Sequence, residues 1–238
     1  MDLLLDPQKT AHQNASDYFE KAKKFERKAA GARASLNKGL KKKAKSRKQP
    51  KKAKWFEEFH WFHTSNGLLC VAGRDAKQNE LLVAKHLTGE DLFFHADVHG
   101  APATILKNGR SAAEQDLGEA AQWACIYSRA WKGGLLVADA YCVPKEQVSK
   151  YSPGEFVGKG AFMIYGERKW FRNVPLKLKL LKQGSEVSAV PERFPGAGKL
   201  AEPGPSSKAV ASKKLHVEWP GVSVTELERV LPGDSQII

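Results

Sequence analysis

The 238-residue chain has few cysteines and no long hydrophobic run, and each shortage excludes a class of protein. Its three cysteines, Cys70, Cys125 and Cys142, include no CxxC pair, so neither a disulfide framework nor a cysteine zinc site is expected. They lie in apolar runs and are predicted to be buried free thiols in a reducing compartment. No stretch approaches the ~20 apolar residues that a membrane helix needs, and the first seven residues are too few and too acidic for a signal peptide. We therefore expect a cytoplasmic protein without membrane contact.

The sequence also lacks the usual signatures of catalysis. It contains no glycine-rich loop of the P-loop or dinucleotide type, so no nucleotide cofactor is expected. Ser65, Ser111 and Ser128 are available as nucleophiles, but none lies in a nucleophile elbow. We expect no enzyme activity and no cofactor. A serine- or metal-dependent hydrolase is the less favoured alternative.

His95, Asp97 and His99 stand two residues apart, a spacing that leaves two interpretations open. On a strand, all three would share one face and could hold a metal ion. Alternatively, Gly100 and Pro102 bend the chain, so that only His95 and Asp97 lie on a strand and His99 lies in the turn. We favour the second interpretation and expect no metal.

Positive charge is concentrated at one end of the chain. Residues 1–54 contain 17 Lys and Arg against 5 Asp and Glu, whereas residues 55–238 contain 22 against 21. The net charge of +13 therefore comes almost entirely from an N-terminal arm. Such an arm favours polyanions through counterion release, although it can also be a simple solvated tail.

The arm and the rest of the chain show different periodicities. Apolar residues recur at spacings of three and four between Tyr18 and Ala32, which predicts an amphipathic helix within residues 8–48, and a basic linker follows. We divide the chain into residues 1–54 (helical or coiled-coil arm and linker), 55–232 (globular domain) and 233–238 (tail). Residues 184–207, rich in Gly, Pro and Ser, are expected to be a loop or an insertion.

Helix and strand patterns alternate irregularly from Trp55 onward. Ser111–Trp131 is predicted to be one long helix, and Phe156–Tyr165 with Lys169–Phe171 a hairpin. Leu215–Glu218 is predicted to be a last strand. Without a regular βαβ repeat, the fold class is α+β: a single mixed sheet-plus-helices domain preceded by a basic N-terminal helix.

Three ordered blocks carry a resemblance to a known family. They are Trp55-Phe-Glu-Glu-Phe-His-Trp-Phe-His63, Gly73-Arg-Asp-Ala-Lys-Gln-Asn-Glu80, and Asp91-Leu-Phe-Phe-His-Ala-Asp-Val-His-Gly-Ala-Pro102. Together they resemble the RNA-binding (R) domain of the NFACT family, the ribosome-associated quality-control factors. Later blocks follow the family order as well, up to Trp219-Pro-Gly221, while the arm resembles the coiled coil before the R domain of archaeal and eukaryotic members.

The resemblance implies an RNA-binding module whose partners are tRNA, large-subunit ribosomal RNA or both. It does not include the family's large N-terminal (NFACT-N) domain, so the tail-elongating activity tied to that domain is not carried over. The arm could instead pair with a separate NFACT-N-type subunit, which would make the chain a protein-interaction module.

Candidate RNA-binding residues come from these blocks and from basic residues interleaved with aromatic ones, which suit unstacked bases and their phosphates. Asp75 could equally be an ordinary helix cap, and any single Trp could be a core residue. The candidates are Lys51, Lys52, Lys54, Arg74, Asp75, Asn79, His95, Asp97, His99, Arg168, Lys169, Trp170 and Arg172.

Overall fold

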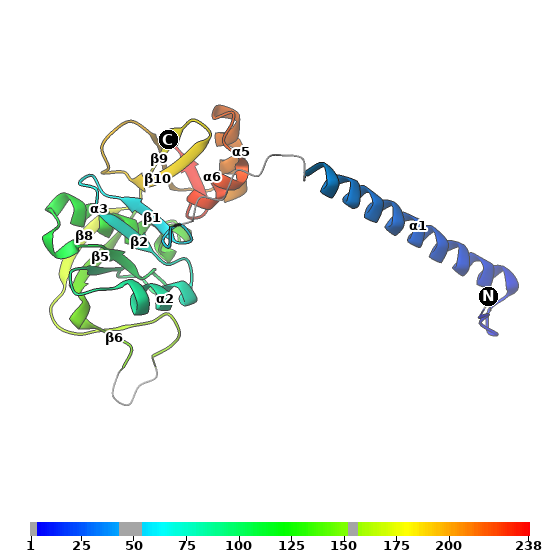
Figure 1. The fold of residues 1–238 in the computed structure, drawn as a ribbon, viewed down its shortest axis with the longest axis horizontal. Coiled ribbons are helices and arrows are strands. Elements are labelled where there is room, and N and C mark those ends of the chain that lie inside the picture. The colour runs from blue at the N-terminus through cyan, green and yellow to red at the C-terminus, as the bar shows by residue number, and fades with distance from the viewer. Residues whose placement is uncertain (1–3, 43–53, 152–156) are drawn as a thin grey trace. The chain divides into compact units, whose positions relative to one another are not determined.

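A computed structural model describes residues 4–42, 54–151 and 157–238, and it divides the chain into two compact units, Met1–Ala53 and Lys54–Ile238. The first unit contains one helix, α1 (Ala11–Lys42) (Figure 1). Thr10 and Gln13 cap its start reciprocally: the Thr10 amide donates to Gln13 Oε1 (2.9 Å), and the Gln13 amide donates to Thr10 Oγ1 (3.2 Å). The helix therefore begins at residue 11 rather than 8. Residues 43–48 of the predicted helix lie outside the described residues.

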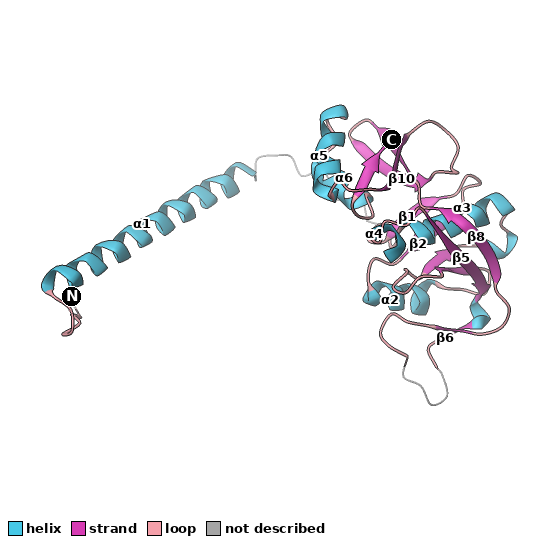
Figure 2. Ribbon diagram, turned by 180° about the vertical axis from the view of Figure 1, so that it is seen from behind, coloured by secondary structure: helices cyan, strands magenta, loops and turns pink. Residues whose placement is uncertain are grey.

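A six-stranded antiparallel sheet forms the centre of the second unit (Figure 2). Its strands, in spatial order, are β1 (His60–His63), β2 (Leu69–Ala72), β4 (Thr104–Leu106), β3 (Leu92–Ala96), β5 (Val137–Pro144) and β8 (Lys169–Pro175). Helix α3 (Glu114–Ile126) packs on one face through Trp123 and its small neighbours. The other face buries Phe93, Ile105 and Tyr141 together with Leu82 of α2 (Ala76–His86).

A second, four-stranded antiparallel sheet joins the core on the α3 side. Its order is β10 (Glu186–Pro191), β9 (Leu178–Gln183), β11 (Lys199–Pro203) and β12 (Ser235–Ile237), with helices α5 (Lys208–Glu218) and α6 (Val224–Val230). Leu178 and Leu180 share one hydrophobic cluster with Trp123, so both sheets belong to one domain. The remaining short elements are η1 (Gly109–Ser111), α4 (Arg129–Lys132), η2 (Lys145–Gln147), β6 (Val148–Ser149) and β7 (Met163–Ile164).

The α+β class and the N-terminal helix are confirmed, but several elements differ from the sequence predictions. Residues 184–207 were expected to be a loop, yet they contain β10 and β11, which pair with β9. A two-residue hairpin turn with Gly184 at φ +61° makes the first of these pairings possible. Residues 233–238 are not a tail, because β12 pairs with β11.

Three further predictions are corrected. The long helix breaks into α3 and α4, because the hydroxyl of Ser128 accepts from the Ala130 amide and starts a new helix. The expected hairpin does not form, since β7 pairs with β6 while β8 pairs with β5. Leu215–Glu218 belongs to α5, which is capped by Ser207.

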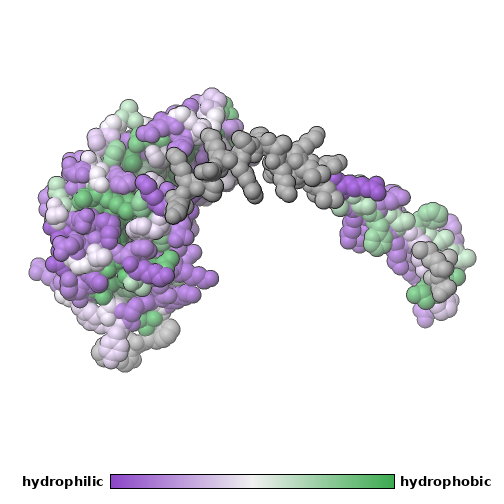
Figure 3. All heavy atoms as spheres, viewed as in Figure 1, coloured by the Kyte–Doolittle hydropathy of each residue, from purple (hydrophilic) through white to green (hydrophobic). Residues whose placement is uncertain are grey.

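Hydrophilic side chains dominate the visible face of the folded domain, with smaller apolar areas between them (Figure 3). No helix among the described residues is long and apolar enough to cross a membrane.

Candidate RNA-binding site

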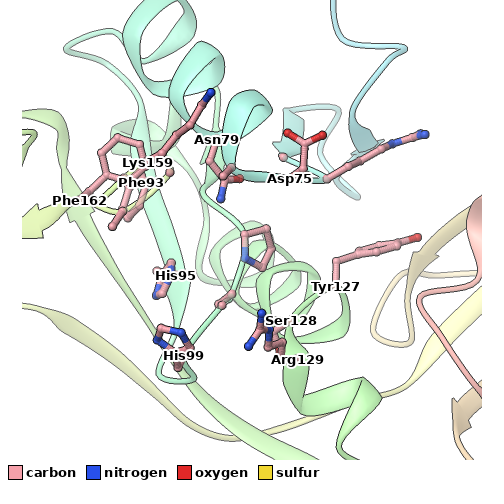
Figure 4. A pocket seen from close by; sticks show the side chains of 18 of the residues that line it. Asp75, Asn79, Phe93, His95, His99, Tyr127, Ser128, Arg129, Lys159 and Phe162 are labelled. Atoms are coloured by element: carbon pink, nitrogen blue, oxygen red, sulfur yellow. The ribbon is translucent and has the colours of Figure 1, made fainter. Parts of the chain in front are cut away.

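A cavity of about 540 Å³ opens beside α2, on the face of the six-stranded sheet that α3 does not cover. Side chains reach it from strands β3 and β5, the start of α2, the turn after β3, the junction of α3 and α4, and residues 159–164 (Figure 4). Four cations line it, and we call them the cationic rim: Arg74, Arg129, Lys132 and Lys159. Three aromatic side chains, Phe93, Tyr141 and Phe162, form what we call the aromatic floor. Asp75 is the one carboxylate among the described lining residues.

The start of α2 is fixed by two of the predicted site residues. The Asp75 side chain caps the helix by accepting from the Gln78 amide at 2.9 Å. Buried Asn79 accepts from the Ala103 amide at 3.2 Å, which ties α2 to the turn after β3. Both residues also line the cavity, so the side chains that hold α2 in place are themselves part of the candidate site.

The turn after β3 separates the three residues of the His-Ala-Asp-Val-His block. The strand ends at Ala96, so only His95 lies on it, and both sequence interpretations placed the end of the strand too late. His95 and His99 line the cavity, whereas exposed Asp97 does not. Burial lowers the pKa of His95, and the carbonyls of Ala101 and Ala96 together with Asp97 offset this only in part. The imidazole is therefore a neutral hydrogen-bonding group at neutral pH.

Arg129 lies across this turn. Gly100 has φ +79°, and a Cβ atom at this position would lie 2.7 Å from Nε and 2.8 Å from Cδ of Arg129. A glycine is thus required twice, for the backbone angle and for the close approach of the arginine. The break between α3 and α4 positions Arg129, because it is the first residue after the Ser128 cap.

Residues 159–164 close the cavity on the side of α2. Glu80 of α2 accepts from the Gly160 amide (3.1 Å) and pairs with Lys150 (2.8 Å), which fastens this segment to the helix. Phe162 then meets Phe93 edge to face, with their ring centroids 5.9 Å apart. Lys159 stands at the edge of the same aromatic contact (Figure 4).

A cross-strand row continues from the cavity toward the edge of the sheet. His95, Tyr141 and Trp170 are direct partners on β3, β5 and β8. The guanidinium of Arg168 lies 4.6 Å from the centroid of the Tyr141 ring, and that of Arg172 lies 4.0 Å from the Trp170 centroid. The Trp170 ring therefore already carries a cation, so it is not a free platform on which a base could stack.

Alternation along β8 splits the predicted basic cluster. Lys169 points to the opposite face, where it pairs with Glu114 at 2.5 Å. Lys54 is exposed, with its ammonium 5.7 Å from the Phe56 ring, and does not line the cavity. Lys51 and Lys52 lie outside the described residues.

The cavity also contains residues that were not among the predicted candidates, including Arg129, Lys132, Lys159, Tyr141 and Phe162. One signal for Arg129 was present in the sequence: a serine, which often caps a helix, precedes it within the supposed long helix. The others come together only through sheet pairing and the return of residues 159–164, which no local pattern shows.

The structure ties the hydroxyls of two proposed nucleophiles to structural partners. Ser128 donates to the Cys125 carbonyl at 2.7 Å and caps α4, and the Ser65 hydroxyl bonds Glu119. The described residues contain no group of three or more His, Cys, Asp or Glu placed to hold a metal ion. Burial raises the pKa of the Cys142 thiol to about 11 and that of Cys125 to about 12, so these two are protonated at neutral pH.

The cavity combines an aromatic floor with a cationic rim. Such a surface suits a polyanion whose bases are free to stack, because the rings meet the bases and the cations meet the phosphates. Residues 58–166 match the family model described as "NFACT protein RNA binding domain". This part of the chain is therefore similar to the NFACT RNA-binding domain family, as the resemblance predicted.

Relatives with this domain carry names from ribosome quality control. The archaeal Rqc2 homolog aRqcH of Methanocaldococcus jannaschii is 45% identical over 130 residues, which cover 54% of this chain and 19% of the relative. The ribosome quality control complex subunit NEMF of Mus musculus is 35% identical over 176 residues, which cover 67% of this chain and 16% of the relative. A Drosophila melanogaster NEMF homolog is 38% identical over 133 residues, covering 55% of this chain and 13% of the relative. The chain thus spans less than a fifth of these relatives' length.

Proposed function

We propose that this chain is a non-catalytic RNA-binding module that acts on tRNA or large-subunit ribosomal RNA during ribosome quality control in the cytoplasm. The names of its relatives support the setting. The observation that carries the proposal is the cavity itself, where four cations face one carboxylate around an aromatic floor. This concentration stands out because residues 55–238 as a whole are nearly neutral.

The two kinds of side chain divide the work of binding. The cationic rim neutralises phosphates, which supplies affinity without reading sequence. The aromatic floor and the neutral His95 suit an unstacked base, so the ligand should be a single-stranded or distorted part of an RNA. The row from His95 to Trp170 offers a path for the strand along the sheet.

The test measures binding to tRNA, to a single-stranded oligonucleotide and to a perfect duplex across salt concentrations. Arg129→Gln combined with Lys159→Gln removes two rim charges from opposite sides of the cavity. Lys145→Gln combined with Lys182→Gln is the matched control, since both lysines are exposed and lie outside the cavity. We expect the first pair to cost about 1 kcal/mol per lost contact, and the control pair much less. Wild-type affinity no better than that of an unrelated basic protein of equal charge would contradict the proposal.

One observation favours a second function, pairing of α1 with another protein. Phe19 and Phe25 are 76% and 67% exposed, and they lie on the helix side that also carries Ala22, Ala29 and Ala32. A lone helix with an apolar stripe is marginal in water, so a partner helix, such as one from a separate NFACT-N-type subunit, would stabilise it. This role would be supported if such a subunit co-purifies with the chain after nuclease treatment. The double variant Phe19→Ser with Phe25→Ser should abolish that co-purification. Loss of the partner on nuclease treatment would reject it.

A further inference from the structure

Four cations from four separate segments gather beside the cavity, around a stacked pair of rings. The rings are His60 of β1 and Tyr127 at the end of α3, with centroids 3.8 Å apart. The cations are Arg74 before α2, Lys132 at the end of α4, Lys208 at the start of α5 and Arg229 of α6. We call these four residues the junction cluster.

Backbone contacts hold the two arginines of the junction cluster close together. Arg74 Nη2 donates to the Phe59 carbonyl at 3.0 Å, and Arg229 Nη2 donates to the Glu57 carbonyl at 2.6 Å. These carbonyls are two residues apart in one tight turn, so the guanidinium groups lie on the same short stretch of chain. The Tyr127 hydroxyl, which donates to the Val230 carbonyl at 2.7 Å, joins α3 to the end of α6 at the same place.

The two lysines are brought together at Asp234. Its carbonyl accepts from Trp131 Nε1 at 3.0 Å, and its carboxylate accepts from the Lys208 amide, also at 3.0 Å. A Cβ atom at Gly233 would lie 3.5 Å from Lys132 Cγ, so the Lys132 side chain runs along this segment. The ends of α4 and α6 and the start of α5 therefore meet at one point.

The charges of the junction cluster are poorly compensated. None of the four cations is within 4.0 Å of a carboxylate oxygen of the described residues. Burial lowers the pKa of Lys208, and Lys132 and Arg74 lower it further, while Glu228 opposes them. Burial and Arg229 lower the pKa of Arg74 in the same way. Like charges held together without partners repel each other, and a bound anion would relieve that repulsion.

We propose that the junction cluster binds a phosphate group of the RNA backbone, through Arg74, Lys132, Lys208 and Arg229. Arg74, Lys132 and Tyr127 also line the cavity, so a nucleotide in the cavity would place a neighbouring phosphate at this cluster. Lys208 and Arg229 lie outside the matched family domain of residues 58–166, which gives the C-terminal helices a direct part in binding. That the bound phosphate belongs to an RNA rests on the proposed function, whereas the ability of the cluster to bind an anion does not.

The test uses tripolyphosphate as a free phosphate probe and RNA as the second ligand. Four full-length proteins are compared: wild type, Lys208→Gln with Arg229→Gln, Lys208→Arg with Arg229→Lys, and Lys213→Gln with Lys214→Gln. The last is the matched control, because both lysines are exposed on α5 and lie outside the junction cluster. The first readout is the gain in melting temperature with tripolyphosphate over sodium chloride of equal ionic strength. This difference cancels any change in basal stability from the lost bond to the Glu57 carbonyl.

We expect a gain of several degrees in the wild type, the charge-conserving variant and the control, and loss of most of it in the Lys208→Gln, Arg229→Gln protein. The salt slope of single-stranded RNA binding should fall by about 0.7 for each lost phosphate contact in that protein alone.

No gain in the wild type, or an equal gain in the charge-removing variant, would overturn the proposal. If the gain behaves as expected but RNA binds no better than to an unrelated basic protein, the anion site stands and the proposed function fails. If the wild type binds RNA well, but the charge-removing variant keeps both the gain in melting temperature and the salt slope, the proposed function stands and the anion site fails.

Discussion

Residues 1–54 and the folded domain carry positive charge in opposite ways. The arm has 17 basic residues against 5 acidic ones along the chain, whereas the domain has nearly equal numbers but gathers four cations at one cavity. A count along the sequence detects the first arrangement and misses the second. The arm should therefore supply affinity for any polyanion, and the cavity should decide which RNA structures are preferred.

Removing the arm should give the largest effect. Deletion of residues 1–50 should lower RNA affinity at about 0.1 M salt on the order of tenfold or more and flatten its salt dependence, because many phosphate contacts are lost together. The melting temperature of the remaining domain should not change, since its cores are formed by residues from Phe56 onward. Filter binding and thermal melting of the two proteins measure both quantities. Unchanged affinity would mean that the folded surface alone holds the RNA.

Gly100→Val should be the most damaging single change within the domain. A β-branched residue at φ +79° strains the backbone by about 1–3 kcal/mol, and its Cβ would also displace Arg129. Gly67→Val is the matched control, because Gly67 has φ +85° but nothing lies within 4 Å of its Cβ position. Chemical denaturation should show a larger loss of unfolding free energy for Gly100→Val, and RNA binding should weaken in that variant alone. Equal losses in the two variants, with equal binding, would contradict the placement of Arg129.

Arg74→Ala should affect both binding and stability modestly. Loss of one charged contact should cost about 1 kcal/mol of RNA affinity, and loss of the bond to the Phe59 carbonyl should cost about 0.5–1.5 kcal/mol of stability. Arg110→Ala is the comparison variant, since Arg110 is exposed, pairs with Glu146 and lies outside the cavity. If Arg74→Ala lowers stability and leaves binding intact, Arg74 has a structural role only.

Acid should destabilise the domain through His60, with the smallest effect of the four. Burial lowers the pKa of His60 well below its usual value, and Arg74, Lys208 and Arg229 lower it further. The unfolded chain then binds more protons than the folded one below about pH 6.5, so stability falls as the pH drops through that range, by at most about 1.4 kcal/mol per pH unit. His60→Gln should reduce this slope in denaturation curves between pH 7.5 and 5.5. Tripolyphosphate should reduce it in the wild type, because a bound anion favours the protonated ring. A slope unaffected by His60→Gln would show that another group titrates.

Local patterns predicted the parts of the fold that depend on local forces. The spacing of apolar residues in the arm predicted α1, and the irregular order of predicted helices and strands indicated the α+β class. The strands β10 and β11 were missed because pairing with β9, rather than their own composition, makes them strands. Tyr127, the residue before the missed helix break, contacts His60 and Val230, both of which are distant in sequence.

The same distinction applies to the site. Arg74, Asp75, Asn79, His95 and His99 come from continuous blocks, and the structure brings them to one cavity. Their role in RNA binding stays a prediction. Tyr141, Lys159 and Phe162 reach that cavity from β5 and from the segment after it, and Lys208 and Arg229 stand beside it because α5 and α6 return to the end of α3. Only tertiary contacts create this neighbourhood, so no spacing in the sequence could have shown it.

The central claim is that the folded domain, without the arm, recognises RNA through the cavity. It is tested most directly by binding of a protein comprising residues 51–238 to tRNA and to a perfect duplex, with and without Arg129→Gln and Lys159→Gln. The account predicts that the shortened protein prefers tRNA to the duplex and that the double variant loses this preference. If the shortened protein shows no preference, or if the double variant keeps it, the cavity is not the site of recognition.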